Sequence, residues 1–117
     1  MKVIIYGTEP EKQEFERAFS LSSSCCYRKI EIVGFSNYDS FIAGLASGSP
    51  ECIVVTMDGA DGMEGVIAAK DMFKNIPVIW FSNDNGFGVQ SYRLGCAYFH
   101  QKPVSPEILS AAIAKCV

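Results

Sequence analysis

The sequence predicts an α/β domain built on a parallel β-sheet, and three observations support this fold class. The chain has 117 residues, a length typical of one domain of about 100–150 residues. Hydrophobic residues make up 49% of it and its formal net charge is only −3, so a folded core is favoured over disorder. Five short apolar segments alternate with five segments of helical spacing. We therefore expect a single domain over residues 1–117.

The apolar segments are expected to be strands because they are short and rich in β-branched and aromatic residues. Three of them are nearly continuous in Val, Ile and Cys, as in strands that are covered on both faces of a parallel sheet. The expected strands are residues 2–6, 30–35, 52–56, 77–81 and 97–101.

The first two helices are expected from a cap and from apolar spacing. Thr8 and Glu11 have the spacing of a capping box, in which each side chain accepts a hydrogen bond from the other residue's backbone N–H. Phe15 and Phe19 then lie four residues apart on one helix face. The second helix has the same kind of stripe, made of Tyr38, Phe41, Ile42 and Leu45.

The last three helices are expected from turn residues and from the spaces between the strands. The third is expected over residues 63–73, and the fourth over residues 88–94, after a turn-rich Asn-Asp-Asn-Gly segment. The fifth begins at Ser105-Pro106, where serine can cap the helix and proline suits the first helical position.

Strands that alternate with helices form right-handed βαβ units and a doubly wound parallel sheet. Five units in this length, (βα)5, fit a five-stranded sheet with the flavodoxin-like strand order 2-1-3-4-5. Ligands bind such sheets outside the carboxyl ends of the strands. The candidate site residues are those that follow the first, third, fourth and fifth strands: Gly7, Thr8, Glu9, Thr56, Met57, Asp58, Ser82, Asn83, Lys102 and Pro103.

Charge and hydropathy exclude two classes of partner. Ten Lys and Arg residues face thirteen Asp and Glu residues, and no basic patch is present, so we expect no direct binding of nucleic acid. No apolar run approaches the roughly 20 residues of a membrane span, and the apolar stretch near the start is too short for a signal peptide. We therefore expect a cytoplasmic protein without a membrane partner.

The sequence also lacks the common arrangements of reactive residues. The five cysteines include the adjacent pair Cys25 and Cys26, but no Cys-x-x-Cys, and the one histidine, His100, has no cysteine beside it. We expect reduced thiols and no metal site. No Ser-His-Asp set, paired carboxylates or glycine-rich phosphate loop is visible, so we expect no catalytic residues and no enzyme.

Four segments, in this order and spacing, resemble parts of the receiver domain of response regulators, a CheY-like family. The longest is residues 95–107, which resembles Gly-Ala-x-x-Tyr-x-x-Lys-Pro-x-x-x-Glu and includes Lys102-Pro103. The others are residues 9–10, 62–65 and 77–82, which resemble the end of an Asp-Asp-Glu-Pro turn, the Gly-Met-Asp-Gly that opens the third helix, and the fourth strand with its terminal Thr or Ser. The resemblance extends from Lys2 to about Lys115.

The acidic part of that family's site is missing from this sequence. Family receivers hold Mg²⁺ with two acidic residues after the first strand and phosphorylate an aspartate that ends the third strand. The resemblance places Gly7 and Thr8 at the acidic pair, and Thr56 or Met57 at the acceptor. Counting forward through the third strand gives Thr56 and counting back from residues 62–65 gives Met57, so the loop between them holds one extra residue. The nearest carboxylate is that of Asp58, which reaches the site only if this extra residue bulges. The resemblance therefore implies an atypical receiver, a pseudo-receiver, with a degenerate phosphorylation site and no magnesium or other cofactor.

The basic part of the site is retained. Ser82 and Lys102 stand where family receivers contact the phosphoryl oxygens. Without acidic partners, Lys102 can pair with Asp58, remain a solvated lysine or bind an anion. Ser82 can stabilise the turn before the fourth helix or contact a ligand.

Two aromatic residues on the fifth strand indicate how the domain could signal. Phe99 stands at the family's switch position, and Tyr98 points to the opposite face of the sheet. The resemblance implies that the fourth helix, the fifth strand and the fifth helix form a partner surface for a sensor kinase, an output domain or a second copy of the chain.

We therefore expect a phosphorylation-independent signalling module that acts by protein–protein contact in two-component signal transduction or a phosphorelay. One alternative is an active response regulator that is phosphorylated on the displaced Asp58. The other is a module that binds a small ligand or nucleotide in the same cleft, with Lys102 and the start of the first helix as its anion site.

Overall fold

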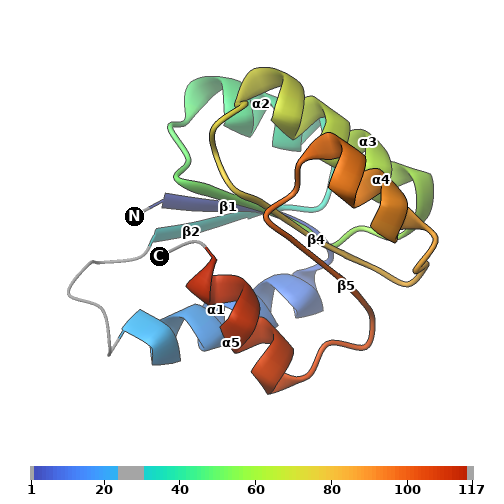
Figure 1. Cartoon of the computed structure of the whole chain (residues 1–117). Helices are drawn as coiled ribbons and strands as arrows, with labels where there is room; N and C mark the ends of the chain where they lie inside the picture. The colour runs from blue at the N-terminus through green and yellow to red at the C-terminus, as the bar shows by residue number, and fades with distance from the viewer. Residues whose placement is uncertain (1, 24–30, 116–117) are drawn as a thin grey trace.

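The computed structural model describes residues 2–23 and 31–115 of the chain. Strands and helices alternate along it, as β1α1β2α2β3α3β4α4β5α5. Figure 1 shows three layers, with the sheet between two groups of helices. The predicted α/β fold class and the predicted alternation are confirmed.

The sheet has five parallel strands in the order β2-β1-β3-β4-β5, as predicted. The strands are β1 (Lys2–Tyr6), β2 (Glu31–Phe35), β3 (Cys52–Val55), β4 (Val78–Ser82) and β5 (Tyr98–Gln101). β1 lies between β2 and β3, where Ile4 pairs with Val33 of β2 and with Ile53 of β3. β1 therefore ends beside β3, and the residues that follow the two strands lie close together at one edge of the sheet.

Helices cover both faces of the sheet (Figure 1). Helices α1 (Glu9–Ser23) and α5 (Pro106–Ala114) lie on one face, and α2 (Tyr38–Ser47), α3 (Gly59–Met72) and α4 (Phe87–Leu94) lie on the other. Phe15 of α1 belongs to the core on the first face, and Phe41 of α2 belongs to the core on the second. The side chain of Phe19, which was expected beside Phe15, lies outside the described residues.

Helix α3 begins at Gly59, four residues before its predicted start at residue 63. The segment before residue 63 is rich in glycine and aspartate, which is typical of a loop, so the predicted start of the helix was too late. In the structure, Gly59 has a φ of 67°, a value that favours glycine, and Asp58 lies at the N-cap with extended backbone. The early start places Asp58 at the edge of the sheet instead of in a long loop.

The cysteines differ from the prediction at one position. Cys52, fully buried at the start of β3, is disulfide-bonded, whereas Cys96 is a free thiol. The expectation of reduced thiols is therefore wrong for Cys52, because spacing in the sequence does not show which cysteines the fold brings together. Cys25, Cys26 and Cys116 lie outside the described residues. Within the described ranges, no helix is long and apolar enough to cross a membrane.

Candidate functional site

The carboxyl ends of β1, β3 and β5 bring the predicted site residues together around Lys102. This lysine follows β5, and its backbone N–H donates to the carbonyl of Ser82 over 2.8 Å, which fixes its position beside β4. Its side chain is 20% exposed and extends across the sheet edge toward α1.

Three acceptors surround the Lys102 ammonium. Nζ lies 2.5 Å from Glu11 Oε2 and 3.0 Å from Asp58 Oδ1, and it donates to the Thr56 carbonyl over 2.5 Å. A lysine ammonium has three N–H donors, so each can have one acceptor here. We call these four groups the Lys102 lock. Of the three alternatives given for Lys102, the structure contains the ion pair with Asp58.

Glu11 is a site residue that the sequence analysis assigned only to a helix cap. Its Oε2 pairs with Lys102, while its Oε1 accepts a hydrogen bond from the Thr8 hydroxyl over 2.8 Å. This hydrogen bond joins two side chains, unlike the predicted capping box, in which each side chain accepts from a backbone N–H. Glu11 lies in the first turn of α1, soon after the end of β1, and that position was the available signal that its side chain could reach the sheet edge.

Asp58 reaches the site although it lies beyond the end of β3. Its side chain is 48% exposed, and Oδ1 pairs with Lys102 and also accepts the backbone N–H of Asn83 over 3.1 Å. The extended backbone of Asp58 and the positive φ of Gly59 turn the carboxylate back toward the strand ends. Asp58 therefore links β5 to the loop that follows β4.

Gly7 and Thr56 fill the space between the ends of β1 and β3. Thr56 is 1% exposed, and its Oγ1 has no hydrogen-bond partner in the described part of the chain. A Cβ on Gly7 would overlap this hydroxyl, so the two residues fit closely only because residue 7 is glycine. Met57 packs with the core on the α3 side, and Thr8 is exposed. Of the two residues proposed for the acceptor position, Thr56 is the one that faces residue 7.

Ser82 stabilises the turn that leads into α4. Its buried hydroxyl accepts the backbone N–H of Asp84 over 3.2 Å, and Asp84 Oδ1 in turn accepts the N–H of Gly86 over 2.8 Å. Of the two roles given for Ser82, the structure contains the turn hydrogen bond. Asn83, which donates to Asp58, lies between these residues, so the Lys102 lock is connected to the start of α4.

The aromatic residues of β5 alternate between the two faces of the sheet, as predicted. Tyr98 packs on the α1 and α5 side, with its ring 6.2 Å from that of Phe81. Phe99 packs on the other side, edge-on to Trp80 at 5.4 Å. Trp80 also stacks on Phe87 at the start of α4, over 5.1 Å. The indole ring therefore lies between β5 and α4.

A second set of acidic residues faces away from the lock. Burial raises the pKa of Tyr6, and the carboxylates of Asp61 and Glu64 and the nearby Tyr38 raise it further. The charges of Asp61 and Glu64 therefore affect Tyr6, whereas the carboxylate of Asp58 pairs with Lys102. Among the described residues, no three His, Cys, Asp or Glu side chains are grouped closely enough to hold a metal ion.

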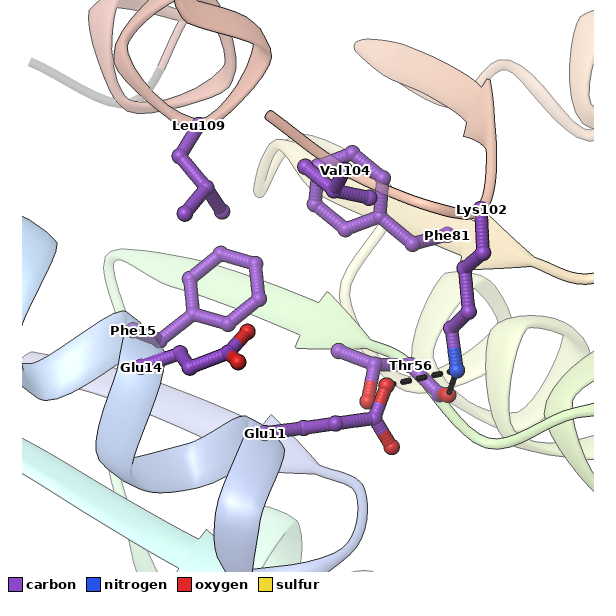
Figure 2. Close-up of a pocket in the computed structure, with 8 residues that line it drawn as sticks. All are labelled: Glu11, Glu14, Phe15, Thr56, Phe81, Lys102, Val104 and Leu109. Carbon is purple, nitrogen blue, oxygen red and sulfur yellow. Dashed lines mark hydrogen bonds and ion pairs between the residues drawn. The ribbon is translucent and has the colours of Figure 1, made fainter. Parts of the chain in front are cut away.

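A cavity of about 90 Å³ lies next to the Lys102 lock, between α1, α5 and the strand ends (Figure 2). Glu11, Glu14, Thr56 and Lys102 form its polar part, and Phe15, Phe81, Val104 and Leu109 form its apolar part. Figure 2 shows the Glu11 carboxylate and the Thr56 carbonyl converging on the Lys102 ammonium at one side of this space.

Comparison with known proteins shows similarity in structure rather than in sequence. No protein-family model matches the sequence, and no curated protein matches it. The response regulatory domain of mrkE from Klebsiella pneumoniae is similar, with a TM-score of 0.81 and 18% identity over 99% of this chain and 94% of that one. The chemotaxis response regulator CheY4 of Vibrio cholerae has a TM-score of 0.79 and 15% identity, over 99% and 98% of the two chains.

A third similar structure belongs to a protein that is not described as a response regulator. It is a putative CpaE2 pilus assembly protein from Sinorhizobium meliloti, with a TM-score of 0.76 and 18% identity over the whole of both chains. All three comparisons cover nearly the full described domain, and all three identities are low. The chain therefore has the CheY-like fold of response-regulator receiver domains.

Proposed function

We propose that the chain is a receiver-like module of two-component signal transduction that acts by protein–protein contact, without phosphorylation of an aspartate, in the cytoplasm. The fold supports the signalling class. The proposal that phosphorylation is not needed depends on the contents of the site at the ends of β1, β3 and β5.

The observation that carries this proposal is the Lys102 lock. Phosphoryl transfer to a carboxylate needs positive charge and hydrogen-bond donors that are directed at the phosphoryl oxygens. Here the lysine at the relevant position has acceptors for all three N–H donors, from Glu11, Asp58 and the Thr56 carbonyl. The charge that an incoming phosphoryl group would use is already neutralised within the molecule.

The fit of Gly7 against Thr56 supports the same proposal. An aspartate at position 7 would place its Cβ into the Thr56 hydroxyl, so an acidic residue fits here only if the Thr56 side chain moves. A magnesium ion needs about six oxygen ligands in near-octahedral geometry. The carboxylates nearest the site are those of Glu11 and Asp58, and both already pair with Lys102.

The exposed face of α4 supports a role in protein–protein contact. Val89 and Tyr92 lie three residues apart on this helix and are 60% and 88% exposed. Large exposed apolar side chains that neighbour one another are typical of interaction surfaces. We propose that α4, β5 and α5 contact a sensor kinase, an output domain or a second copy. Sedimentation analysis over a concentration series, with Tyr92→Ser as the variant, tests the second copy directly.

Asp58 favours one alternative function, that of an active response regulator. Its carboxylate reaches Lys102 and is about half exposed, so a phosphodonor could approach it. The test is intact-mass spectrometry after incubation with Mg²⁺ and acetyl phosphate. We expect no added phosphoryl group, while an active receiver domain treated in parallel gains one. A phosphoryl group that is lost in Asp58→Asn but kept in the neighbouring Asp61→Asn would overturn our proposal in favour of this alternative.

The other alternative, a nucleotide or phosphate site at Lys102, has no support from the charges around it. Two carboxylates lie against the Lys102 ammonium and would repel an anion. We therefore expect nucleotides and inorganic phosphate to leave the melting temperature unchanged. A stabilisation by phosphate that is lost in Lys102→Ala would contradict this expectation.

A further inference from the structure

The cavity beside the Lys102 lock combines an apolar wall with a charged rim. Phe15, Phe81, Val104 and Leu109 form the wall, and the volume is about 90 Å³. The rim includes Glu14 of α1, which is exposed, so the cavity opens to solvent there. Concave sites with mostly apolar walls and a few directed polar groups are typical of small-molecule binding.

The charges that line the cavity favour a cation. Glu11 and Glu14 contribute two carboxylates, and Lys102 contributes one ammonium. The Lys102 ammonium is engaged by Glu11, Asp58 and the Thr56 carbonyl, so it offers no free donor to an anion. Glu14 makes no ion pair with any described residue, and its carboxylate is therefore available to a positively charged group.

A buried polar atom at the inner wall has no partner. Thr56 is 1% exposed, and its Oγ1 has no hydrogen-bond partner in the described part of the chain. Figure 2 shows this hydroxyl on the side of the Glu11 carboxylate. Buried hydroxyl groups are normally hydrogen-bonded, so the fold leaves here a group that a donor on a ligand would satisfy.

The size and the wall define the kind of cation. A cavity of about 150 Å³ holds a benzene ring, so this smaller one accommodates about three or four carbon atoms. A hydrated magnesium ion does not suit it, because half of the lining side chains are apolar and supply no oxygen ligands. A short carbon chain that carries an ammonium group matches both parts of the lining.

We propose that this cavity binds a small primary alkylammonium ion. Its ammonium group donates to the carboxylates of Glu11 and Glu14 and to Thr56 Oγ1, and its carbon chain lies against Phe15 and Leu109. The site goes beyond the signalling function proposed above and does not depend on it. Binding at this position would add a small-molecule input between α1 and α5, on the face of the sheet opposite α4.

The test is a two-dimensional ¹H–¹⁵N NMR titration with n-propylammonium, and with n-propanol and propionate as matched neutral and anionic probes. We expect saturable shifts of the amides around Phe15, Thr56 and Leu109 with n-propylammonium, at least tenfold tighter than with either matched probe. Equal affinity for n-propanol would show an apolar void only, and tighter binding of propionate would show an anion site. Either result, or the absence of saturable shifts, would overturn the proposal.

Two variants and one control separate binding from folding. Glu14→Gln removes an exposed carboxylate from the rim and should weaken n-propylammonium binding at least fivefold. Glu16→Gln, on the same helix but outside the cavity, should leave the affinity unchanged. Val104→Leu should abolish binding by filling the space. If Val104→Leu disturbs the fold, as its NMR spectrum would show, Glu14→Gln decides the question, and unchanged affinity in that variant would overturn the proposal.

Discussion

The two halves of the strand-end site are filled in different ways. Between β1 and β3, the backbone of Gly7 lies against the buried side chain of Thr56, and the space is closed by close fit. Beside β5, Lys102 keeps its charge, and Glu11 and Asp58 neutralise it from α1 and from the start of α3. The first half is closed by uncharged residues, whereas in the second half two carboxylates lie against one ammonium group. The absence of an expected acidic residue at one position in the sequence therefore does not show which charged side chains from other segments lie at the site.

The largest effect is expected from disturbing the close fit between β1 and β3. Gly7→Ala places a methyl group into the Thr56 hydroxyl and should lower the free energy of unfolding by about 1–3 kcal/mol. In a Thr56→Ala background, the same change should cost less than about 1 kcal/mol, because the overlapping oxygen is gone. Urea unfolding of the four proteins of this cycle measures the difference. Equal costs in both backgrounds would show that the two residues do not fit against each other.

The next effect is expected from removing the cation of the Lys102 lock. Lys102→Met leaves the carboxylates of Glu11 and Asp58 without their shared partner. The groups are partly exposed, so the expected loss is about 1–2 kcal/mol, between the values for surface and buried ion pairs. Urea unfolding measures it. Lys70→Met is the matched control, because Lys70 Nζ donates to one exposed carbonyl, that of Lys74. A loss no larger than in this control would contradict the lock.

Cys96 lies just before β5, at the end of the strand opposite Lys102, and its thiol makes a pH-dependent contribution to stability. Burial raises the pKa of the Cys96 thiol to about 11 from 9.0, while the Lys70 ammonium acts in the opposite direction. The folded state therefore holds this proton more tightly than the unfolded state. Its contribution to stability is present below about pH 9 and is lost as the pH rises toward about 11.

The difference in unfolding free energy between the wild type and Cys96→Ala isolates this contribution. We expect the difference to shrink between about pH 8 and about pH 11. The alkylation rate of Cys96 should rise over the same range, because the thiolate is the reactive form. Fast alkylation of this thiol at about pH 8 would contradict the raised pKa.

The smallest effect is expected from removing the hydrogen bond between the Thr8 hydroxyl and the Glu11 carboxylate. Thr8→Val removes the hydroxyl that donates to Glu11 Oε1 at an exposed position, so stability should fall by less than about 0.5 kcal/mol. Thermal unfolding in parallel with Lys102→Met measures it. A loss as large as that of Lys102→Met would show that Thr8, and not the ion pairs, positions Glu11.

The fold could be predicted from the sequence because its strands are short, continuous apolar runs that are covered on both faces. Ile4 and Ile53, for example, are buried in neighbouring strands as their segments predict. The start of α3 was missed because Asp58 and Gly59 are loop residues by composition, whereas in the structure Asp58 is the N-cap and Gly59, with a positive φ, is the first residue of the helix.

The site could be predicted in part. The pair between Lys102 and Asp58 follows from their places after β5 and β3, the two strands on either side of β4, because the carboxyl ends of parallel strands share one edge of the sheet. Glu11 was missed because its local role at a helix start explained it without tertiary contacts. The disulfide at Cys52 was missed because the spacing of cysteines in a sequence does not show which of them are bonded. For Glu11, the local pattern was a sufficient explanation, and the contact that decides its role comes from Lys102, a distant residue in the sequence.

The most direct test of the proposed function is the NMR signal of the Lys102 side-chain ammonium. Three acceptors should slow the exchange of its protons with water enough to give a separate signal that disappears in Lys102→Met. We predict that this signal keeps its position when Mg²⁺ and acetyl phosphate are added together. A signal that shifts or disappears on their addition would show that the site receives a phosphoryl group, and would contradict phosphorylation-independent signalling.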